Sequence, residues 1–337
     1  MKALVLTQYK KAGLDTVVLK DLPQPQPTNS QVLVRLKAAA FNPADLHIIS
    51  GEMKAMSPNK APFALGVDGA GVVESVGSGV SHFKVGDEVM FYTGLVWSGT
   101  VAEYIAVDVN ACAIKPASWT FEQAAAAALG LLCARQALNR AQVKSGQHIL
   151  IHGGGGAVGA AAIVLAQNLG ATVDTTANVA DTEYLKSLGV HIVFDYKTQP
   201  LTSLPKAHYD MVLDGLGDET LLQSLPLLKK TGVVISLKVM TGVDDMARMG
   251  MNVPWIFKLL MPLMFRKFTK VAHKAGVQLH GVATYQDGKT LEAIAKIAEQ
   301  KSYLPRIDRT FALNEAKEAL EYFANSKTRG KVVVRMD

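Results

Sequence analysis

Short runs of hydrophobic residues, interrupted by glycine and proline, fill the first third of the chain. Apolar segments at 32–36, 67–76 and 87–91 lie beside turns that contain Pro or Gly, and residues 1–6 form another such run. Short strands separated by turns of this kind are typical of a barrel-like β domain. We therefore predict a β domain at the start of the chain.

The pattern changes near residue 120, where helices begin to alternate with strands. Thr120 precedes Phe-Glu-Gln, a helix-capping sequence, and an Ala-rich helical run follows. The hydrophobic pattern then predicts strands at 147–152, 172–176, 191–194, 209–214 and 232–237, and helices at 157–169, 181–188 and 219–228. Because parallel strands need crossover connections, this alternation predicts a parallel sheet. Two later helices and a strand at 331–335 are expected to return to the first domain.

One apolar stretch, residues 253–265, raises the question of a membrane span. It is shorter than the roughly 20 apolar residues that a spanning helix needs, and it contains Lys258 and Pro262. We predict a buried or interface helix pair here and no membrane span. The alternatives are contact with a membrane surface and a role in substrate entry.

Composition narrows the class of protein further. The 337 residues are 49% hydrophobic and 19% charged, and the net charge of +6 is spread without a long basic run, so we expect no nucleic-acid partner. Two cysteines provide no disulfide framework or Cys-x-x-Cys pair, which fits a reducing compartment. Because the N-terminus has the pattern of a strand and not of a signal peptide, we expect a cytoplasmic location.

A glycine-rich segment at 153–159 gives the strongest local motif. It follows the predicted strand ending at His152 and begins an Ala-rich helix, which is the context that gives Gly-x-Gly-x-x-Gly its meaning. Gly154 and Gly156 allow a tight turn close to a pyrophosphate, and Gly159 allows the helix to pack on the strand. The N–H groups at the helix N-terminus favour phosphate. This segment predicts a dinucleotide site.

The end of the next strand bears on the choice between NAD and NADP. An NAD site usually places Asp or Glu there to bind the ribose 2′-OH. This chain has Thr176 and Asn178 at that end, whereas Asp174 lies within the strand. Neutral donors favour a 2′-phosphate, so we predict NADP(H). The preference would reverse if Asp174 reached the ribose.

Several ordered motifs together resemble the medium-chain dehydrogenase/reductases, in particular their zinc-free quinone oxidoreductase (zeta-crystallin-like) and alkenal/enone reductase branch. The motifs occur along nearly the whole chain, at residues 41–51, 66–73, 83–89, 99–104, 149–159, 209–214 and 329–333. The resemblance implies a GroES-like β-barrel catalytic domain at 1–122 and 284–337, and a Rossmann domain with a doubly wound parallel sheet at 123–283. It also implies an active site between the two domains and a homodimer.

The resemblance also implies particular cofactor contacts. Gly155, Ala157 and Val158 match the pyrophosphate loop, Tyr196 matches an adenosine-phosphate contact, and Lys331 is a weaker match to a cofactor contact. The chain departs from many relatives in two ways. It has Cys133 where they often have Thr, and it lacks their basic residue after the second strand of the Rossmann domain.

Zinc ligands of the wider family are replaced in this chain. Catalytic zinc needs three protein ligands and an open position. Asn42 stands where the zinc-dependent members have a Cys ligand, and Val67, before Asp68, stands where they have a His ligand. His47 and Asp68 alone do not make a site, so we predict no metal.

Without zinc, alcohol oxidation lacks a group that stabilises the alkoxide. We therefore expect hydride transfer from NADPH to a small hydrophobic electrophile, either a quinone or an α,β-unsaturated carbonyl compound. Asn42, His47 and Tyr92 are the candidate donors to the developing oxyanion. The alternatives are a turn residue for Asn42, a structural histidine for His47 and a packing role for Tyr92. For the whole chain, the alternatives are an enoyl-thioester reductase and a nucleotide-binding protein with little turnover.

Overall fold

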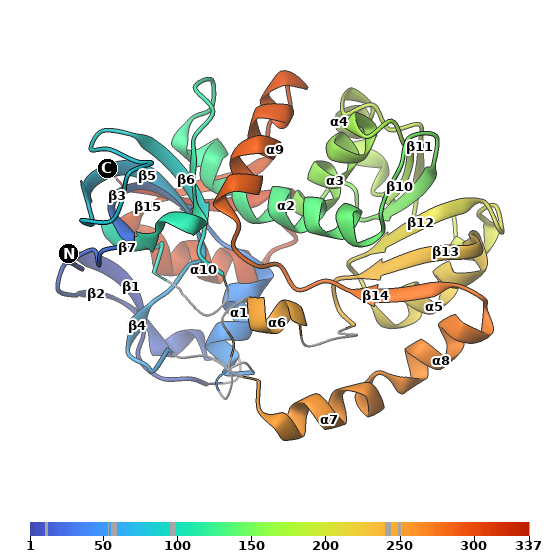
Figure 1. Cartoon of the computed structure of the whole chain (residues 1–337), viewed down its shortest axis with the longest axis horizontal. Coiled ribbons are helices and arrows are strands. Elements are labelled where there is room, and N and C mark those ends of the chain that lie inside the picture. The colour runs from blue at the N-terminus through green and yellow to red at the C-terminus, as the bar shows by residue number, and fades with distance from the viewer. Residues whose placement is uncertain are drawn as a thin grey trace. The chain divides into compact units, whose positions relative to one another are not determined.

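The protein is described here by a computed structural model that covers residues 1–10, 13–52, 54, 59–94, 99–239, 244–248, 251 and 253–336. The chain forms two compact units (Figure 1). Unit 1 comprises Met1–Leu132, Arg248–Asn252 and Tyr285–Asp337, and unit 2 comprises Cys133–Ala247 and Val253–Thr284. The chain passes between the units within helix α2 (Phe121–Arg140), which also contains the boundary predicted at residue 122.

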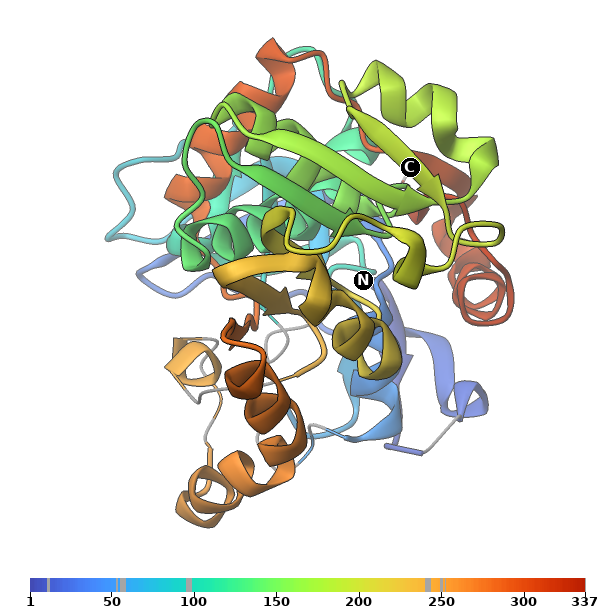
Figure 2. The ribbon, with the colours of Figure 1, turned by 90° about the vertical axis from the view of Figure 1, so that its right-hand side faces the viewer.

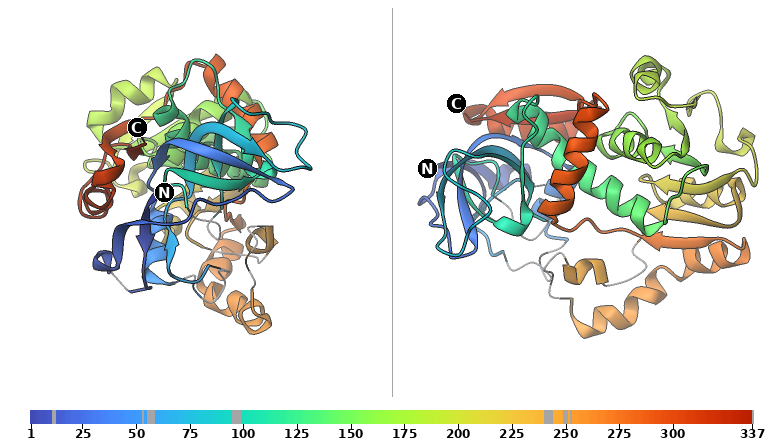
Figure 3. Two further views of the ribbon diagram at one scale, coloured as in Figure 1. Left: turned by 90° about the vertical axis from the view of Figure 1, so that its left-hand side faces the viewer. Right: turned by 45° about the horizontal axis from the view of Figure 1, so that its top comes forward.

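Unit 1 is built on β-sheets, as its short apolar runs predict, and the described strands pair antiparallel except for one parallel pair near the C-terminus. Among the described residues, one sheet has the order β2-β1-β4 and a larger one the order β15-β16-β3-β5-β6-β8, with β7 paired to β3. Figure 3 shows the ribbon from two further sides. The strands are β1 (Lys2–Leu6), β2 (Val17–Asp21), β3 (Gln31–Ala40), β4 (Phe63–Ala64), β5 (Asp68–Val76), β6 (Glu88–Tyr92), β7 (Tyr104–Asp108), β8 (Cys112–Ile114), β15 (Ile307–Ala312) and β16 (Lys331–Arg335). The expected return of the last segment to the first domain is confirmed, because β16 pairs with β3.

Close packing of β3 against β5 depends on glycine. A Cβ at Gly71 would collide with the backbone carbonyl oxygen of Arg35 on the neighbouring strand.

Helices α1 (Pro43–Ser50), α9 (Gly288–Gln300) and α10 (Ala316–Asn325) complete this unit. The predicted cap of α2 is also confirmed, since Thr120 Oγ1 accepts from the Gln123 N–H at 3.2 Å.

Unit 2 contains the predicted parallel sheet, in the order β11-β10-β9-β12-β13-β14 within the described residues. Its strands are β9 (His148–His152), β10 (Thr172–Ala177), β11 (Ile192–Asp195), β12 (Tyr209–Asp214), β13 (Leu228–Ser236) and β14 (Gln278–Gly281). The chain starts in the middle, moves to one edge, returns and moves to the other edge. This is the strand order of a doubly wound dinucleotide-binding sheet, whose switch point lies between β9 and β12. The predicted fold class is confirmed.

Helices of unit 2 cover both faces of the sheet (Figure 2). Because the crossovers are right-handed, helices connecting the first three strands lie on one face and those connecting the last three lie on the other. The first set is α3 (Ala157–Asn168) and α4 (Thr182–Ser187); the second set is α5 (Asp218–Ser224), α7 (Trp255–Met264) and α8 (Arg266–Lys274), and α6 (Asp244–Arg248) precedes α7. Tyr209, Val212 and Val234 belong to a buried cluster between the sheet and the second set.

The apolar stretch at 253–265 forms one helix, α7, and not the predicted helix pair, and most of it is exposed and not buried. Its predicted role in an interface stays a prediction. Met261 is buried, whereas Trp255 is 74% exposed and Leu259 is 65% exposed. A ten-residue amphipathic helix can bury only a narrow stripe, and here most of its large apolar residues lie outside that stripe. No described helix is both long enough and apolar enough to cross a membrane.

Candidate active site and cofactor-binding residues

The first candidate site is organised by the start of helix α1. Asn42 has extended backbone geometry immediately before Pro43, and its N–H donates to Asp45 Oδ2 at 2.7 Å. Asn at the N-cap, Pro in the first turn and an acidic residue at the third helical position together favour a helix start here. The turn considered for Asn42 is therefore the N-cap of a helix.

Three buried side chains from distant parts of the sequence meet at this N-cap. Lys331, the first residue of β16, donates from Nζ to Asn42 Oδ1 and, at 3.0 Å, to Asp68 Oδ2 at the start of β5. Asn42 Nδ2 donates to the same Asp68 oxygen at 3.0 Å and to the Ala40 carbonyl at 3.2 Å. The Leu129 N–H donates to Asp68 Oδ1 at 3.0 Å. This Asn42–Asp68–Lys331 network thus engages both polar atoms of the Asn42 side chain.

Burial dominates the electrostatics around this network. It raises the pKa of Asp68, while the Lys331 ammonium and the Asn42 amide act in the opposite direction. Burial also raises the pKa of Asp45 to about 7; the Asn42 N–H and Lys331 oppose this effect and Asp68 adds to it. Asp45 Oδ1 is buried without a hydrogen bond among the described residues. Asp45 is therefore a carboxyl group that changes charge near neutral pH.

The other two catalytic candidates lie on either side of this region of unit 1. Tyr92 ends β6 directly opposite Asp68 and is buried. His47 lies in the last turn of α1, where its Nδ1 is 2.7 Å from Glu52 Oε2, and its side chain is 45% exposed. The structure thus places Asn42 and Tyr92 beside Asp68, and pairs His47 with Glu52. Their catalytic roles stay predictions.

In unit 2, the glycine-rich loop turns between β9 and α3. Gly153 and Gly154 both donate to the Thr176 carbonyl, which fixes the loop against the end of β10. A Cβ at Gly154 would collide with Thr175 Oγ1, and one at Gly155 would lie 2.8 Å from Asp181 Oδ2. Gly156 is the N-cap of α3 and has no capping side chain, so side chains leave the first turn of the helix uncapped. The loop therefore has the shape and dipole that a diphosphate requires.

Beneath the loop lies a histidine that sequence reasoning treated only as the end of a strand. His152 Nε2 is 2.8 Å from Ser224 Oγ, and its Nδ1 is 3.0 Å from Thr176 Oγ1. Because the Ser224 hydroxyl donates to the Thr220 carbonyl, Nε2 must carry the proton and Nδ1 accepts from Thr176. Burial lowers the pKa of His152 to about 4, so the ring is neutral. It braces β9 against β10 and α5.

The predicted adenosine contacts lie at the carboxyl ends of β10 and β11. Thr176 is buried and holds the loop, while Asn178 caps the next turn by accepting from the Ala180 N–H at 3.1 Å. Tyr196 follows β11, is 57% exposed, and its N–H donates to the Ala177 carbonyl. The backbone therefore brings Asn178 and Tyr196 to the same edge of the sheet. Lys331 lies in unit 1, and its predicted cofactor contact stays a prediction.

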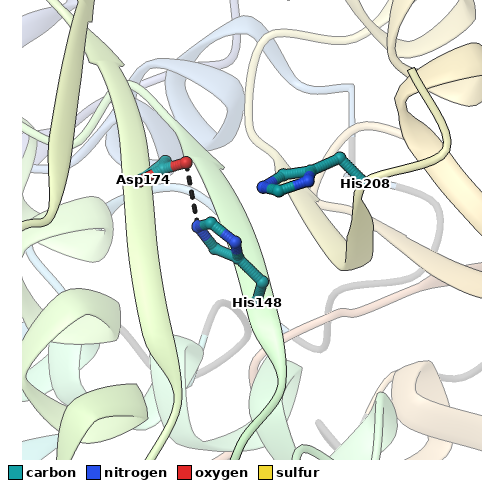
Figure 4. Close-up of side chains that lie close together, drawn as sticks. All are labelled: His148, Asp174 and His208. Carbon is teal, nitrogen blue, oxygen red and sulfur yellow. Dashed lines mark ion pairs between the residues drawn. The ribbon is translucent and has the colours of Figure 1, made fainter. Parts of the chain in front are cut away.

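Asp174 is buried on the amino side of that edge, and its carboxylate is already engaged (Figure 4). Its Oδ2 lies 2.9 Å from His148 Nε2 and accepts from the Tyr209 hydroxyl at 3.0 Å. Its Oδ1 lies 3.0 Å from His191 Nδ1 and accepts from the Ile192 N–H. Protein partners thus occupy both oxygens of the Asp174 carboxylate, and the preference for NADP stays a prediction.

Comparisons with known proteins agree with this architecture. Residues 28–117 match the GroES-like domain of alcohol dehydrogenases, and residues 188–334 match the zinc-binding dehydrogenase family. A 2-methylene-furan-3-one reductase of Solanum lycopersicum is 31% identical over 345 residues, covering 99% of this chain and 79% of that protein. A chloroplastic NADPH-dependent alkenal/one oxidoreductase of Arabidopsis thaliana is 35% identical over 246 residues, which cover 70% of this chain. The match spans 62% of that relative, less than two thirds of its length.

A solved structure gives the same relationship in three dimensions. The quinone oxidoreductase from Coxiella burnetii superposes with a TM-score of 0.82 at 31% identity, covering 100% of this chain and 99% of that one. The chain therefore belongs to the medium-chain dehydrogenase/reductase superfamily, and its relatives there include quinone and alkenal/enone oxidoreductases.

Proposed function

We propose that this oxidoreductase uses NADPH, without catalytic zinc, to reduce a quinone or an α,β-unsaturated carbonyl compound. The observation that carries this proposal is the Asn42–Asp68–Lys331 network. Asn42 and Asp68 stand at positions of the zinc-dependent members' motifs, and here the ammonium of Lys331 bonds to both. A second cation beside this ammonium would be repelled in a buried site. The names of the similar quinone and alkenal/one oxidoreductases support the substrate class.

The shape of the glycine loop supports a bound dinucleotide. Side chains at Gly154 or Gly155 would collide with Thr175 or approach Asp181, and the first turn of α3 has no capping side chain. We assign the diphosphate to residues 154–158 and the adenosine end to Asn178 and Tyr196. The buried Thr176 hydroxyl donates to His152 Nδ1, so we assign this predicted contact to holding the loop. The bound nicotinamide would supply the hydride.

The chain's own groups then need only to bind and orient an already electrophilic substrate and to stabilise the oxygen that gains charge. Asn42 has all its polar atoms engaged within the network, so we assign it to positioning the start of α1. Tyr92 and His47 remain the candidate donors. The Glu52 carboxylate at Nδ1 orients the His47 ring and favours a proton on that nitrogen, which leaves Nε2 as the nitrogen that can face a substrate.

One set of assays tests the substrate class and the dependence on zinc. Oxidation of NADPH and of NADH at matched concentrations would be followed with a benzoquinone, a 2-alkenal, an enoyl thioester and a simple ketone, before and after dialysis against a chelator. We expect turnover of the quinone or the alkenal with NADPH, unchanged by the chelator. Preference for the ketone, or loss of activity that zinc restores, would overturn the proposal. Preference for the thioester would favour an enoyl-thioester reductase. Tight NADPH binding without turnover on any substrate would favour a nucleotide-binding protein.

A single charge tests the assignment of NADP. Asn178→Asp places a carboxylate at the end of β10, where it would repel a 2′-phosphate and bind a ribose 2′-OH. We expect the ratio of NADPH to NADH affinity to fall by at least about tenfold. The matched control is Asn168→Asp, the same change at the exposed far end of α3, which should leave the ratio unchanged. An unchanged ratio in Asn178→Asp would contradict the assignment. The homodimer and the cytoplasmic location stay predictions.

A further inference from the structure

Four polar side chains form a row across unit 2, near the amino ends of neighbouring strands. His191 precedes β11, Asp174 lies in β10, His148 begins β9 and His208 precedes β12. These strands are neighbours in the order β11-β10-β9-β12. Since adjacent strands lie about 4.8 Å apart, such a register places the side chains within reach of one another. Figure 4 shows the rings of His148 and His208 close to each other and to the Asp174 carboxylate.

The contacts within this row converge on one small volume. One ligand atom each from His148, Asp174 and His208 can be chosen so that all three lie within 4.8 Å of one another. The centroids of the His148 and His208 rings are 4.4 Å apart, with the rings edge to face. Although His148 Nε2 lies 2.9 Å from Asp174 Oδ2, this contact does not have the geometry of a hydrogen bond. The nitrogen is thus buried beside a carboxylate without a directed bond.

We propose that His148, Asp174 and His208 bind a divalent transition-metal ion, of which Zn²⁺ is the best match. Two imidazoles and a carboxylate are a ligand set that zinc commonly takes in proteins, at about 2.0–2.2 Å. Ligand atoms of a tetrahedral zinc site lie about 3.3 Å apart. Small side-chain rotations would bring the three ligand atoms to that spacing, with a solvent molecule in the fourth position.

The surroundings of the three residues are those of a metal site. Asp174 is 1% exposed, and its orientation is fixed by the Tyr209 hydroxyl, the Ile192 N–H and His191. Such outer contacts orient a ligating carboxylate. Burial is the main cause that lowers the pKa of His148, the Asp174 carboxylate opposes it, and the neighbouring His208 and His191 add to the lowering. The lowered pKa favours the neutral imidazole, which is the form that binds a metal.

The position of the site in unit 2 separates it from the nucleotide. Metal ligands come from the amino halves of β9 and β10 and from the loop before β12, whereas the glycine loop follows the carboxyl end of β9. Bound metal would cross-link three segments of the sheet without touching the glycine loop. We therefore assign the ion a structural role that is independent of catalysis.

The test measures Zn²⁺ and Ni²⁺ binding to the full chain, purified without a polyhistidine tag. Titration calorimetry should find one tight Zn²⁺ site per chain, and Zn²⁺ should raise the thermal unfolding temperature. His208→Asn removes one ligand and should weaken Zn²⁺ binding by at least about tenfold. The matched control His273→Asn alters an exposed histidine in α8 and should leave binding unchanged.

A second variant guards against misfolding as an explanation. His148→Asn should abolish the Zn²⁺-induced rise in unfolding temperature while NADPH still binds, because the glycine loop is remote from the change. The proposal is overturned if the wild-type chain binds Zn²⁺ no more tightly than His208→Asn. Equal weakening by His273→Asn would show adventitious surface binding and would overturn it as well.

Discussion

Two buried aspartates, Asp68 in unit 1 and Asp174 in unit 2, differ in the groups that compensate their charge. Asp68 is 0% exposed and Asp174 is 1% exposed, so both side chains are almost fully shielded from solvent. Asp68 faces a lysine ammonium, an amide and a backbone N–H, all of them buried. Asp174 faces two histidines, a tyrosine hydroxyl and a backbone N–H, and the His191 side chain is 56% exposed.

The comparison shows that the groups around a buried carboxylate, and not its degree of burial, determine which role the carboxylate can have. Lys331 Nζ, Asn42 Nδ2 and the Leu129 N–H all donate to the Asp68 carboxylate, so the network around Asp68 holds this side chain in one position. A neutral imidazole has a lone pair that can bind a metal, so histidines beside a buried carboxylate can form a ligand site with it. The same degree of burial therefore accompanies a structural hydrogen-bond network in unit 1 and a candidate ligand site in unit 2.

Removing the cation from Asp68 should give the largest effect. Lys331→Met keeps the length of the side chain but leaves a buried carboxylate without its counter-ion, which typically costs about 3–5 kcal/mol. Urea unfolding at pH 7 would measure the loss. The double variant Lys331→Met with Asp68→Asn should recover part of it. A loss below about 1 kcal/mol would mean that Asp68 is protonated in the native state and that the network around it is not ionic.

Next in size is a pH effect beside the same network. The pKa of Asp45 is raised to about 7 in the folded protein, above its usual value of 3.8, so the folded state holds more protons between those values. Stability from this group is therefore present at low pH and is lost as pH rises through about 7, by up to about 1.4 kcal/mol per pH unit. Asp45→Asn should remove this slope and be more stable than the wild type at pH 8. Parallel pH profiles of unfolding free energy for the two proteins would rule the effect out.

In unit 2 a comparable pH effect has the opposite sign. The pKa of His152 is lowered to about 4, below its usual value of 6.5, so the unfolded state holds more protons between those values. Stability is present above pH 6.5 and falls as pH drops toward 4, again by up to about 1.4 kcal/mol per pH unit. His152→Gln should flatten this part of the profile, measured by urea unfolding between pH 7 and pH 5. If the variant lost as much as the wild type over that range, His152 would not be the group that titrates.

The alternation of strands and helices was predictable because hydrophobic periodicity is local, and every strand predicted between residues 147 and 237 occurs. The glycine loop was predictable for the same reason. Helix α1 was not predicted, although Asn42, Pro43 and Asp45 form a recognisable helix start. These residues carry a capping signal, whereas Asn42 is interpreted from the sequence as a candidate donor or, alternatively, a turn residue.

The sequence does not show which group compensates the charge of Asp68. Lys331 is 263 residues away along the chain, and it comes close to Asp68 because β16 pairs with β3. Asp174 shows the same limit. Its position within a strand was evident, but the two histidines that contact it come from the start of β9 and from the connection before β11. Contacts of this kind depend on sheet order, and sheet order follows from the whole fold and not from any local pattern.

The smallest expected effect compares one hydrogen bond at Asp174 with a matched bond near the surface. Tyr209→Phe removes a hydroxyl that donates to Asp174 Oδ2, while His148, His191 and the Ile192 N–H still face the carboxylate. Because the ring stays in the core, only the hydrogen bond is lost, at a cost of about 1 kcal/mol in the free energy of unfolding.

Tyr322→Phe is the matched control, since it deletes a tyrosine hydroxyl that donates to Asp308 Oδ2 at 2.8 Å on the exterior of unit 1. Solvent can replace that bond, so the control should lose less stability in the same urea titration. If the two variants lost equal amounts, the remaining partners of Asp174 would already satisfy it as fully as water satisfies Asp308. The tyrosine would then contribute packing alone, and the orientation of the proposed metal ligand would rest on the backbone N–H and on His191.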